Sequence, residues 1–313
     1  MRKKMEFYKR RTGMITDSQT NAVYFSSLLP AKCPELNAHI TEALRKRGVP
    51  FGYLSETRDI WCRDYMPIQV DKDHLVSYNY TPDYLKGHLR LQTDPEIVLQ
   101  ADANELFRHL PTNRKETVSF DGLCPILVMK LEVETTKIDL VIDGGNVVKC
   151  GDVVVMTEKV FAENKDKSRL EVERILRDAF RCDILFLPWD REEYLGHSDG
   201  IIHYAGDGRV LLTNYDDFSP YFFRRFRKYL ESMFEVVPLR YKVKRKHARS
   251  WAYINFLQVG NLVLIPQLGI EEDRQALEQI GAALPGCELL GIPALEAVRK
   301  GGALNCISWN IQK

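Results

Sequence analysis

The stretch Gly196-His197-Ser198-Asp199-Gly200-Ile201-Ile202 decides the fold, because its pattern returns along the chain. It is a polar head that runs into an apolar strand, and a second apolar strand at residues 210–213 follows the turn Asp207-Gly208. Short runs of Val, Ile and Leu bounded by glycine are typical of strands. A polar head followed by two strands is therefore the unit to look for elsewhere.

The unit occurs five times. Polar heads recur at Asp143, His197, Tyr253 and Cys306, which are 54, 56 and 53 residues apart. An earlier head at Asp64 precedes Asp143 by 79 residues, and we assign the excess to a helical insertion around residues 82–110. Five such units predict a closed pseudo-symmetric arrangement whose heads converge on one axis.

Helices are expected between the strands, so the chain reads as an α/β protein. Apolar residues at helical spacing predict them at residues 34–47, 168–180, 221–234, 271–284 and 293–299, with Ser219 as one N-cap. No linker-like tract divides the chain. We therefore expect one domain over residues 21–313, preceded by a partly disordered basic tail over residues 1–20.

Composition excludes several classes of protein. The 313 residues include 44 Lys and Arg against 43 Asp and Glu, a net charge of +1 that argues against a nucleic-acid partner. No apolar run is long enough to span a bilayer, and no apolar region follows the basic first residues as in a secretory signal. The seven cysteines form no C-x-x-C pair, which favours a reduced cytoplasmic protein without a disulfide framework.

The heads carry the side chains that could do chemistry, which are Asp64, Asp143 with Asn146, His197 with Asp199, Asn255, and Cys306 with Asn305. If the segment is a regular strand, His197 and Asp199 point to one face. A cysteine and a histidine are the minimum for covalent catalysis. A metal site is not expected, because His197-x-Asp199 has no further His or Cys at a suitable local spacing.

The carboxylates indicate the substrate. Asp64 and Asp199 beside Cys306 would raise the pKa of the thiol and weaken it against a neutral amide. A planar cation removes this penalty, because a guanidinium offers N–H groups that two carboxylates can bind and its charge favours the thiolate. The sequence therefore predicts a small cationic guanidine substrate.

Four motifs resemble those of a known group, and they are Trp61-Cys62-Arg63-Asp64-Tyr65-Met66-Pro67, Asp143-Gly144-Gly145-Asn146, Gly196-His197-Ser198-Asp199 and Gly301-Gly302-Ala303-Leu304-Asn305-Cys306. They resemble blocks of the guanidine-modifying superfamily of five-bladed α/β propellers (pentein fold). The similarity is greatest to the agmatine deiminase and bacterial, Porphyromonas-type peptidylarginine deiminase family, and it covers residues 24–312.

The resemblance implies hydrolysis of a guanidine such as agmatine to a ureido product, with release of ammonia and no cofactor. It implies that Cys306 attacks the guanidinium carbon, that Asp64 and Asp199 hold its nitrogens, and that His197 exchanges protons. Four further side chains are expected to bind the substrate or support the site, namely Trp61, Asp143, Asn146 and Asn255. Asp143 could instead only fix the Gly144-Gly145 turn.

Two departures from the family pattern bear on the substrate. Arg191-Glu192-Glu193-Tyr194-Leu195 stands where agmatine deiminases carry an acidic stretch, so that Glu193 is the expected contact for a distal amine. Asn305 stands where the family has a histidine before the cysteine. Deimination of free or peptide C-terminal arginine, and amidino transfer by the same residues, are the alternatives. A homodimer contact through Phe222, Phe223 and Phe226 is another open alternative to a core role for that helix.

Overall fold

The computed structural model describes residues 13–54, 57, 59–82, 118–119, 125–126, 134–193 and 195–313. The first twelve residues of the predicted tail, Cys124 and nearly all of the predicted helical insertion lie outside this described part.

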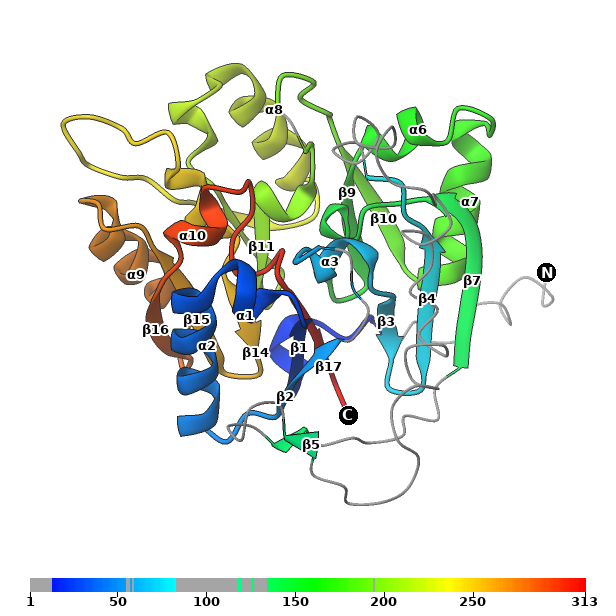
Figure 1. Cartoon of the computed structure of the whole chain (residues 1–313). Coiled ribbons are helices and arrows are strands. Elements are labelled where there is room, and N and C mark those ends of the chain that lie inside the picture. Colours follow the sequence, from blue (N-terminus) through cyan, green and yellow to red (C-terminus); the bar gives the residue numbers. More distant parts are fainter. Residues whose placement is uncertain are drawn as a thin grey trace, which may run out of the picture.

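Five three-stranded sheets surround a central axis (Figure 1). In each sheet the middle strand pairs antiparallel with one neighbour and parallel with the other. We call each sheet with its helices a blade. The strands of blades one to five are, in turn, β3 (Ile68–Asp71), β4 (His74–Asn79) and β7 (Glu134–Val141); β8 (Val148–Cys150), β9 (Val153–Thr157) and β10 (Asp183–Leu187); β11 (Ile202–Gly206), β12 (Arg209–Leu212) and β13 (Glu235–Pro238); β14 (Leu257–Val259), β15 (Leu262–Gln267) and β16 (Glu288–Pro293); and β17 (Ser308–Ile311), β1 (Ala22–Ser26) and β2 (Phe51–Leu54).

The predicted closed, pseudo-symmetric α/β arrangement is confirmed. Blade five joins the last strand, β17, to the first, β1, so the ring closes without a covalent link. A separate pair of short strands, β5 (Val118–Ser119) and β6 (Pro125–Ile126), lies outside the five sheets.

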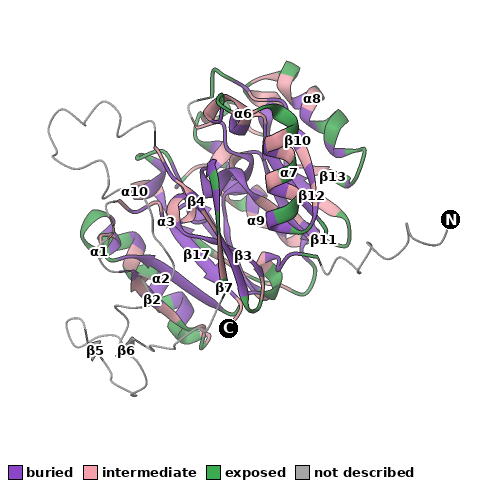
Figure 2. Ribbon diagram, turned by 90° about the vertical axis from the view of Figure 1, so that its right-hand side faces the viewer, coloured by how far each residue is buried: buried purple, intermediate pink, exposed green. Residues whose placement is uncertain are grey.

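In blades two to five, the described helices connect the parallel strands and cover the outside of the ring, because a parallel pair needs a crossover connection. Their outward faces are exposed and their inward faces buried against the sheets (Figure 2). They are α1 (Leu29–Lys32), α2 (Pro34–Lys46), α6 (Lys159–Glu163), α7 (Arg169–Phe180), α8 (Pro220–Leu230), α9 (Glu272–Ala283) and α10 (Leu295–Val298). The five predicted helices are all present, although α8 and α10 are shorter than expected. Ser219 is the predicted N-cap of α8, since its side chain accepts from Phe222 N.

The polar heads are short helical turns, not strands, and this corrects the prediction. They are α3 (Cys62–Tyr65), η3 (Gly144–Asn146), η4 (Ser198–Gly200), η6 (Ser250–Ile254) and a turn at residues 304–307. Each directly precedes the first strand of its blade. In a 3-10 turn the backbone groups bond to one another, for example Ile201 N to Ser198 O. These bonds satisfy the backbone where it lies outside the hydrogen-bond ladder of the sheet. Cys62 lies in α3 and is fully buried, as expected of a core thiol.

The segment that precedes β1 packs into the domain. Met14 is 2% exposed and its N–H donates to Gly151 O, and η1 (Asp17–Gln19) carries an ion pair from Asp17 to Lys149. Residues 13–20, which the sequence assigned to a tail, are therefore part of the packed structure.

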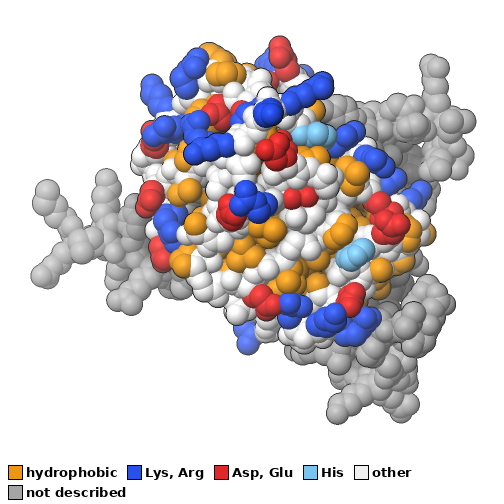
Figure 3. All heavy atoms as spheres, turned by 90° about the vertical axis from the view of Figure 1, so that its left-hand side faces the viewer, with side chains coloured by type: hydrophobic (Ala, Val, Ile, Leu, Met, Phe, Trp, Pro, Cys, Tyr) orange, Lys and Arg blue, Asp and Glu red, His pale blue; other side chains and the backbone are white. Residues whose placement is uncertain are grey.

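Two surface features are also settled. Phe223 and Phe226 of α8 are buried and Phe222 packs against the same cluster, so this face serves the core of blade three. The basic stretch at residues 240–249 is a mostly exposed loop that pairs with acidic groups, through Arg240 with Asp216 and Lys246 with Asp217. Cationic and anionic side chains are mixed on the face shown in Figure 3. Within the described residues, no helix has the length and apolar character to cross a membrane.

Candidate active site

Three side chains from two different heads surround one point beside Gly145. A Cβ added to this glycine would lie 2.7 Å from Asp64 Oδ1, 2.9 Å from His197 Nδ1 and 3.2 Å from Asp199 Oδ1. These atoms belong to blades one and three, and the glycine belongs to blade two. The convergence of heads that the repeat spacing predicted therefore places two carboxylates and an imidazole around one small volume.

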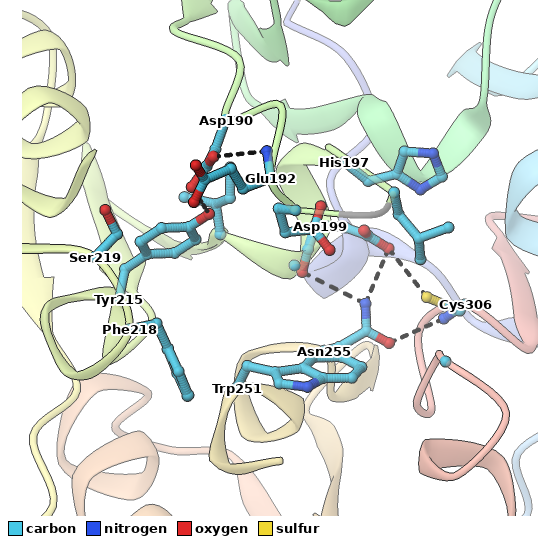
Figure 4. Close-up of a pocket in the computed structure, with 15 residues that line it drawn as sticks. Asp190, Glu192, His197, Asp199, Tyr215, Phe218, Ser219, Trp251, Asn255 and Cys306 are labelled. Atoms are coloured by element: carbon cyan, nitrogen blue, oxygen red, sulfur yellow. Dashed lines mark hydrogen bonds between the residues drawn. The ribbon is translucent and has the colours of Figure 1, made fainter. Parts of the chain in front are cut away.

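Cys306 lies beside this point, at the wall of a cavity (Figure 4). Its thiol donates to Asp199 Oδ2 at 3.7 Å, and its backbone N–H donates to Asn255 Oδ1 at 3.2 Å. Burial, followed by the nearby Asp199 and Asp64 carboxylates, raises the pKa of the Cys306 thiol well above its ordinary value. The site thus carries the electrostatic penalty that the sequence predicted for a thiol among carboxylates.

Asp199 has one oxygen held by the protein. Its Oδ2 accepts from Asn305 Nδ2 at 2.8 Å and from Asn255 Nδ2 at 3.0 Å, in addition to the thiol of Cys306. Its Oδ1 is the oxygen that faces the point beside Gly145. Asn305 therefore fixes a carboxylate, and Asn255 links that carboxylate to the backbone of the cysteine.

His197 is held between two carboxylates. Its Nε2 lies 2.9 Å from Asp143 Oδ2, and its Nδ1 lies 3.6 Å from Asp64 Oδ1 without a hydrogen-bond partner. Burial alone would lower the pKa of His197, but Asp64 and Asp143 raise it to about 9. At neutral pH the imidazole is therefore protonated, and Nδ1–H points toward the open volume.

The two carboxylates beside His197 differ. Burial raises the pKa of Asp64 to about 7, against the opposing effect of His197, and Gly145 N donates to its Oδ1 at 2.9 Å. Burial would also raise the pKa of Asp143, but His197 and Lys159 hold it below its usual range. Asp143 thus contacts His197, and a substrate contact for it stays a prediction.

Three other predicted residues lie as follows. Asn146 Oδ1 accepts from Thr157 N at 2.8 Å and Ser198 N at 3.2 Å, so that it fixes the head that follows it. Trp61 lies against Gly302, where an added Cβ would be 2.3 Å from its ring. Glu193 lines the cavity and accepts from Gly196 N. Substrate contacts by these three remain predictions.

The cavity has a volume of about 440 Å³. Cys306, Asn255 and Asp199 lie on one side, Asp190, Glu192 and Phe218 lie on the other, and Trp251 lies between them (Figure 4). Its full lining is Asp190, Glu192, Glu193, Leu195, His197, Asp199, Gly200, Ile201, Tyr215, Phe218, Ser219, Trp251, Asn255, Gly301 and Cys306.

The sequence did not identify several of these residues. Tyr215 and Phe218 come from segments outside the repeated motifs, and Trp251 lies in the fourth head but had no predicted role. Lys159, which pairs with Asp143 at 2.5 Å, was also missed. Its signal is a lysine next to the buried Val160 at the start of a helix. In the described part of the chain, no group of three or more His, Cys, Asp and Glu side chains could hold a metal ion.

Comparison with known proteins agrees with this architecture. The family model of the Porphyromonas-type peptidyl-arginine deiminases matches residues 31–311. Two solved structures share the fold over 96% of this chain and 96% of their own. They are the agmatine deiminase of C. jejuni, with a TM-score of 0.71 and 16% identity, and that of Enterococcus faecalis, with 0.69 and 18%. The five-bladed pentein fold is thereby confirmed.

Curated relatives match over a shorter region. A protein of Lactococcus lactis named "Putative agmatine deiminase" is 24% identical over 207 residues, and one of Vibrio parahaemolyticus with the same name is 26% identical over 208. These matches cover 54% and 55% of this chain and 57% and 58% of the relatives, so the chain spans little more than half the length of the curated relatives it matches.

Proposed function

The chain belongs to the Porphyromonas-type peptidyl-arginine deiminase family, and from this membership we propose that it hydrolyses the guanidinium group of agmatine to a ureido group. The products are N-carbamoylputrescine and ammonia. The observation that carries the proposal is the convergence of Asp64 Oδ1, Asp199 Oδ1 and His197 Nδ1 on one point beside Cys306.

Binding of the cation prepares the thiol. The guanidinium N–H groups donate to the Oδ1 atoms of Asp64 and Asp199. These hydrogen bonds are strong because both partners are charged. The substrate charge offsets the two carboxylates that raise the pKa of Cys306, so the thiolate becomes accessible only in the complex. A planar cation is thus bound and activates the nucleophile at the same time.

The first half-reaction replaces a C–N bond by a C–S bond. Cys306 Sγ attacks the guanidinium carbon, and the thiol proton passes to a neighbouring carboxylate, because His197 is already protonated. His197 Nδ1–H protonates the departing nitrogen, which leaves as ammonia. A cationic amidino-thioester remains on Cys306, so charge and protons balance between thiol, substrate and product.

The second half-reaction returns the thiol. Having lost a proton, His197 acts as a base on water, which adds to the same carbon as the C–S bond breaks. The products of this step are the ureido compound, the Cys306 thiol and one proton. Over the whole cycle, one guanidinium and one water give one ureido group and one ammonium ion.

The far end of the cavity favours an amine over an amino acid. Asp190, Glu192 and Phe218 lie on the side of the cavity away from Cys306 (Figure 4), and two carboxylates with an aromatic ring suit a distal ammonium. None of the described residues that line the cavity is Lys or Arg, so the lining offers no cation for the carboxylate of free arginine. We also keep a cytoplasmic location in the proposal, because Cys33, Cys62, Cys150, Cys287 and Cys306 are free thiols.

The test is an ammonia and ureido assay with agmatine, free arginine and peptides with C-terminal or internal arginine. We expect turnover of agmatine to exceed that of the other substrates and to vanish in Cys306→Ala. Cys306→Ser should still bind agmatine in calorimetry. Silence across the panel, or full activity in Cys306→Ala, would refute the proposal, and a product formed only with an added amine acceptor would identify a transferase instead.

A further inference from the structure

A buried lysine lies directly behind the histidine of the site. Lys159 is the first residue of α6, and its side chain is only 7% exposed. Its Nζ lies 2.5 Å from Asp143 Oδ2, 3.3 Å from Glu163 Oε1 and 3.5 Å from His197 Nε2. A lysine is rarely buried unless it is paired, because removing its charge from water is costly. The position of this one therefore needs an explanation.

Asp143 Oδ2 is shared by two cations. The same oxygen accepts from Lys159 Nζ at 2.5 Å and from His197 Nε2 at 2.9 Å. Asp143 belongs to the head of blade two, whereas Lys159 follows β9, the middle strand of that blade, and His197 belongs to blade three. The lysine and the imidazole therefore hold the same carboxylate oxygen from adjacent directions, since Lys159 Nζ lies 3.5 Å from His197 Nε2, and the lysine limits the freedom of the carboxylate to turn away.

The aliphatic part of Lys159 is also held. A Cβ added to Gly196 would lie 3.5 Å from Lys159 Cδ and 2.4 Å from Trp189 Nε1, so Gly196 allows the chain before His197 to pass close to both side chains. The φ of Gly196 is +64°, a conformation that favours glycine. The Gly-His motif and the lysine are thus packed as one unit.

Charge makes the lysine unusual in this cluster. The titratable groups around His197 are Asp64 from α3, Asp143 before η3, Lys159 and Glu163 from α6, Asp199 from η4 and Cys306 from the turn before β17. Four of them are carboxylates. Among these described groups, Lys159 is the cation other than His197 itself.

We propose that Lys159 is a positioning residue of the reaction: it anchors Asp143 against His197 Nε2, and its charge sets the pH range over which His197 exchanges protons. The assignment of a reaction role rests on the proposed deimination. Lys159 acts through Asp143 and His197, and it reaches neither the thiol nor the open point beside Gly145.

The chemistry explains why such a residue is useful. His197 must give a proton to ammonia and then take one from water, so a pKa far above the working pH would stall the second step. Asp64 and Asp143 raise the pKa of His197, whereas Lys159 lowers it. The lysine thus keeps the aspartate in place and at the same time limits its effect on the basicity of the imidazole.

The first test follows the titration of His197 directly. In protein labelled with ¹⁵N-histidine, the His197 signals are assigned by their loss in His197→Gln, and their pH midpoint is measured without substrate. Lys159→Met removes the charge at similar length and should raise the midpoint by about one pH unit. Lys159→Arg keeps the charge and should leave it within about 0.3 units of the wild-type value.

Two further variants make the test specific. Lys149→Met removes another buried lysine, whose Nζ pairs with Asp17 Oδ1 at 3.2 Å. Because its ion pair is with Asp17 and not with the Asp143–His197 pair, this substitution should leave the His197 midpoint unchanged. Lys159→Gln also removes the charge, and it replaces Lys159→Met should that variant not fold. An unchanged His197 midpoint in the neutral variant, or an equal shift in Lys149→Met, overturns the inference.

The second test uses turnover of agmatine. In Lys159→Met, the acid limb of the kcat–pH profile should move to higher pH by the same amount as the His197 midpoint. At pH 7.5, kcat should fall about tenfold and KM should change less. Lys159→Arg should restore most of kcat. A purely structural lysine would lower stability and leave the pH profile in place.

The two tests separate the two proposals. If wild-type protein acts on no guanidine but the His197 midpoint still moves in Lys159→Met, the proposed function fails and the control of His197 by Lys159 stands. If agmatine is turned over and the midpoint does not move, the proposed function stands and the role of Lys159 is refuted.

Discussion

Gly145 shows most directly how single residues build the site. Asp64, His197 and Asp199 all approach the position where any other residue would have its Cβ. Its N–H also donates to Asp64 Oδ1. The residue is therefore glycine because the reacting groups need the space that a side chain would take.

We expect Gly145→Ala to lower kcat/KM for agmatine by about 100-fold or more, because the added methyl group displaces Asp64 and His197 from their positions. Steady-state kinetics and urea unfolding measure the two effects separately. Gly281→Ala in α9, where the nearest atom to an added Cβ is the side-chain Cδ2 of Leu289 at 3.2 Å, is the control and should retain full activity. Near-normal turnover in Gly145→Ala would show that the point beside Gly145 is not where the substrate reacts.

At the scale of elements, the heads are tied to one another by hydrogen bonds that form a complete ring. The bonds run from Gly145 N to Asp64 Oδ1, from Ser198 N to Asn146 Oδ1, from Asn255 Nδ2 to Asp199 Oδ2, from Cys306 N to Asn255 Oδ1 and from Arg63 N to Cys306 O. Each bond joins one blade to the next. The site is thus located where the blades are fastened together.

Asn146 and Asn255 play the same role in this ring, since the side-chain oxygen of each accepts a hydrogen bond from a backbone N–H of the head that follows. We expect Asn146→Ala to lower the free energy of unfolding by about 2 to 4 kcal/mol, because it leaves the N–H groups of Thr157 and Ser198 buried without an acceptor. Turnover should fall as well, because Ser198 adjoins His197.

Urea unfolding measures the loss of stability in Asn146→Ala, and agmatine kinetics measure the loss of turnover. Asn79→Ala is the matched control: its amide makes an exposed contact with Asp139, and its loss should cost less than about 0.5 kcal/mol. A comparable cost for the two substitutions would mean that the amide of Asn146 does not tie the heads together.

At the scale of the whole molecule, the ring closes where the two ends of the chain meet. Trp309 of β17 donates from Nε1 to Pro67 O at 2.8 Å and packs on Tyr24 of β1 at a ring distance of 5.6 Å. It therefore joins blade five, which contains Cys306 just before β17, to blade one, which contains Asp64 just before β3. Cys306 and Asp64, which the proposal places around the guanidinium group, depend on this contact for their relative position.

We expect Trp309→Ala to lower the free energy of unfolding by about 3 to 5 kcal/mol and to reduce agmatine turnover, because a buried ring is lost at the closure of the propeller. Trp309→Phe keeps most of the packing and should cost about 1 to 2 kcal/mol, the value of the lost hydrogen bond. Thermal unfolding followed by circular dichroism measures both. Equal stability of Trp309→Ala and wild type would show that the closing contact contributes little.

The sequence by itself determined the number of units, their order and the chemistry of their heads. The spacing of the repeats depends on the number of residues between them and on their local pattern, and both can be read from the amino-acid sequence. For this reason the five blades and the helices between the strands were predicted correctly. The structure brings Asp64, His197, Asp199 and Cys306 together, and their catalytic roles stay a prediction.

Tertiary structure alone decided how those groups face one another. His197 and Asp199 meet at the site through a 3-10 turn and not through strand alternation, because the local backbone at the axis depends on bonds between blades. The cavity walls from Tyr215, Phe218 and Trp251 and the pairing of Lys159 with Asp143 join segments that no short pattern connects. Contacts between distant residues form only when the ring closes, and this is why the sequence singled out the polar residues of the heads but not the surroundings that hold them.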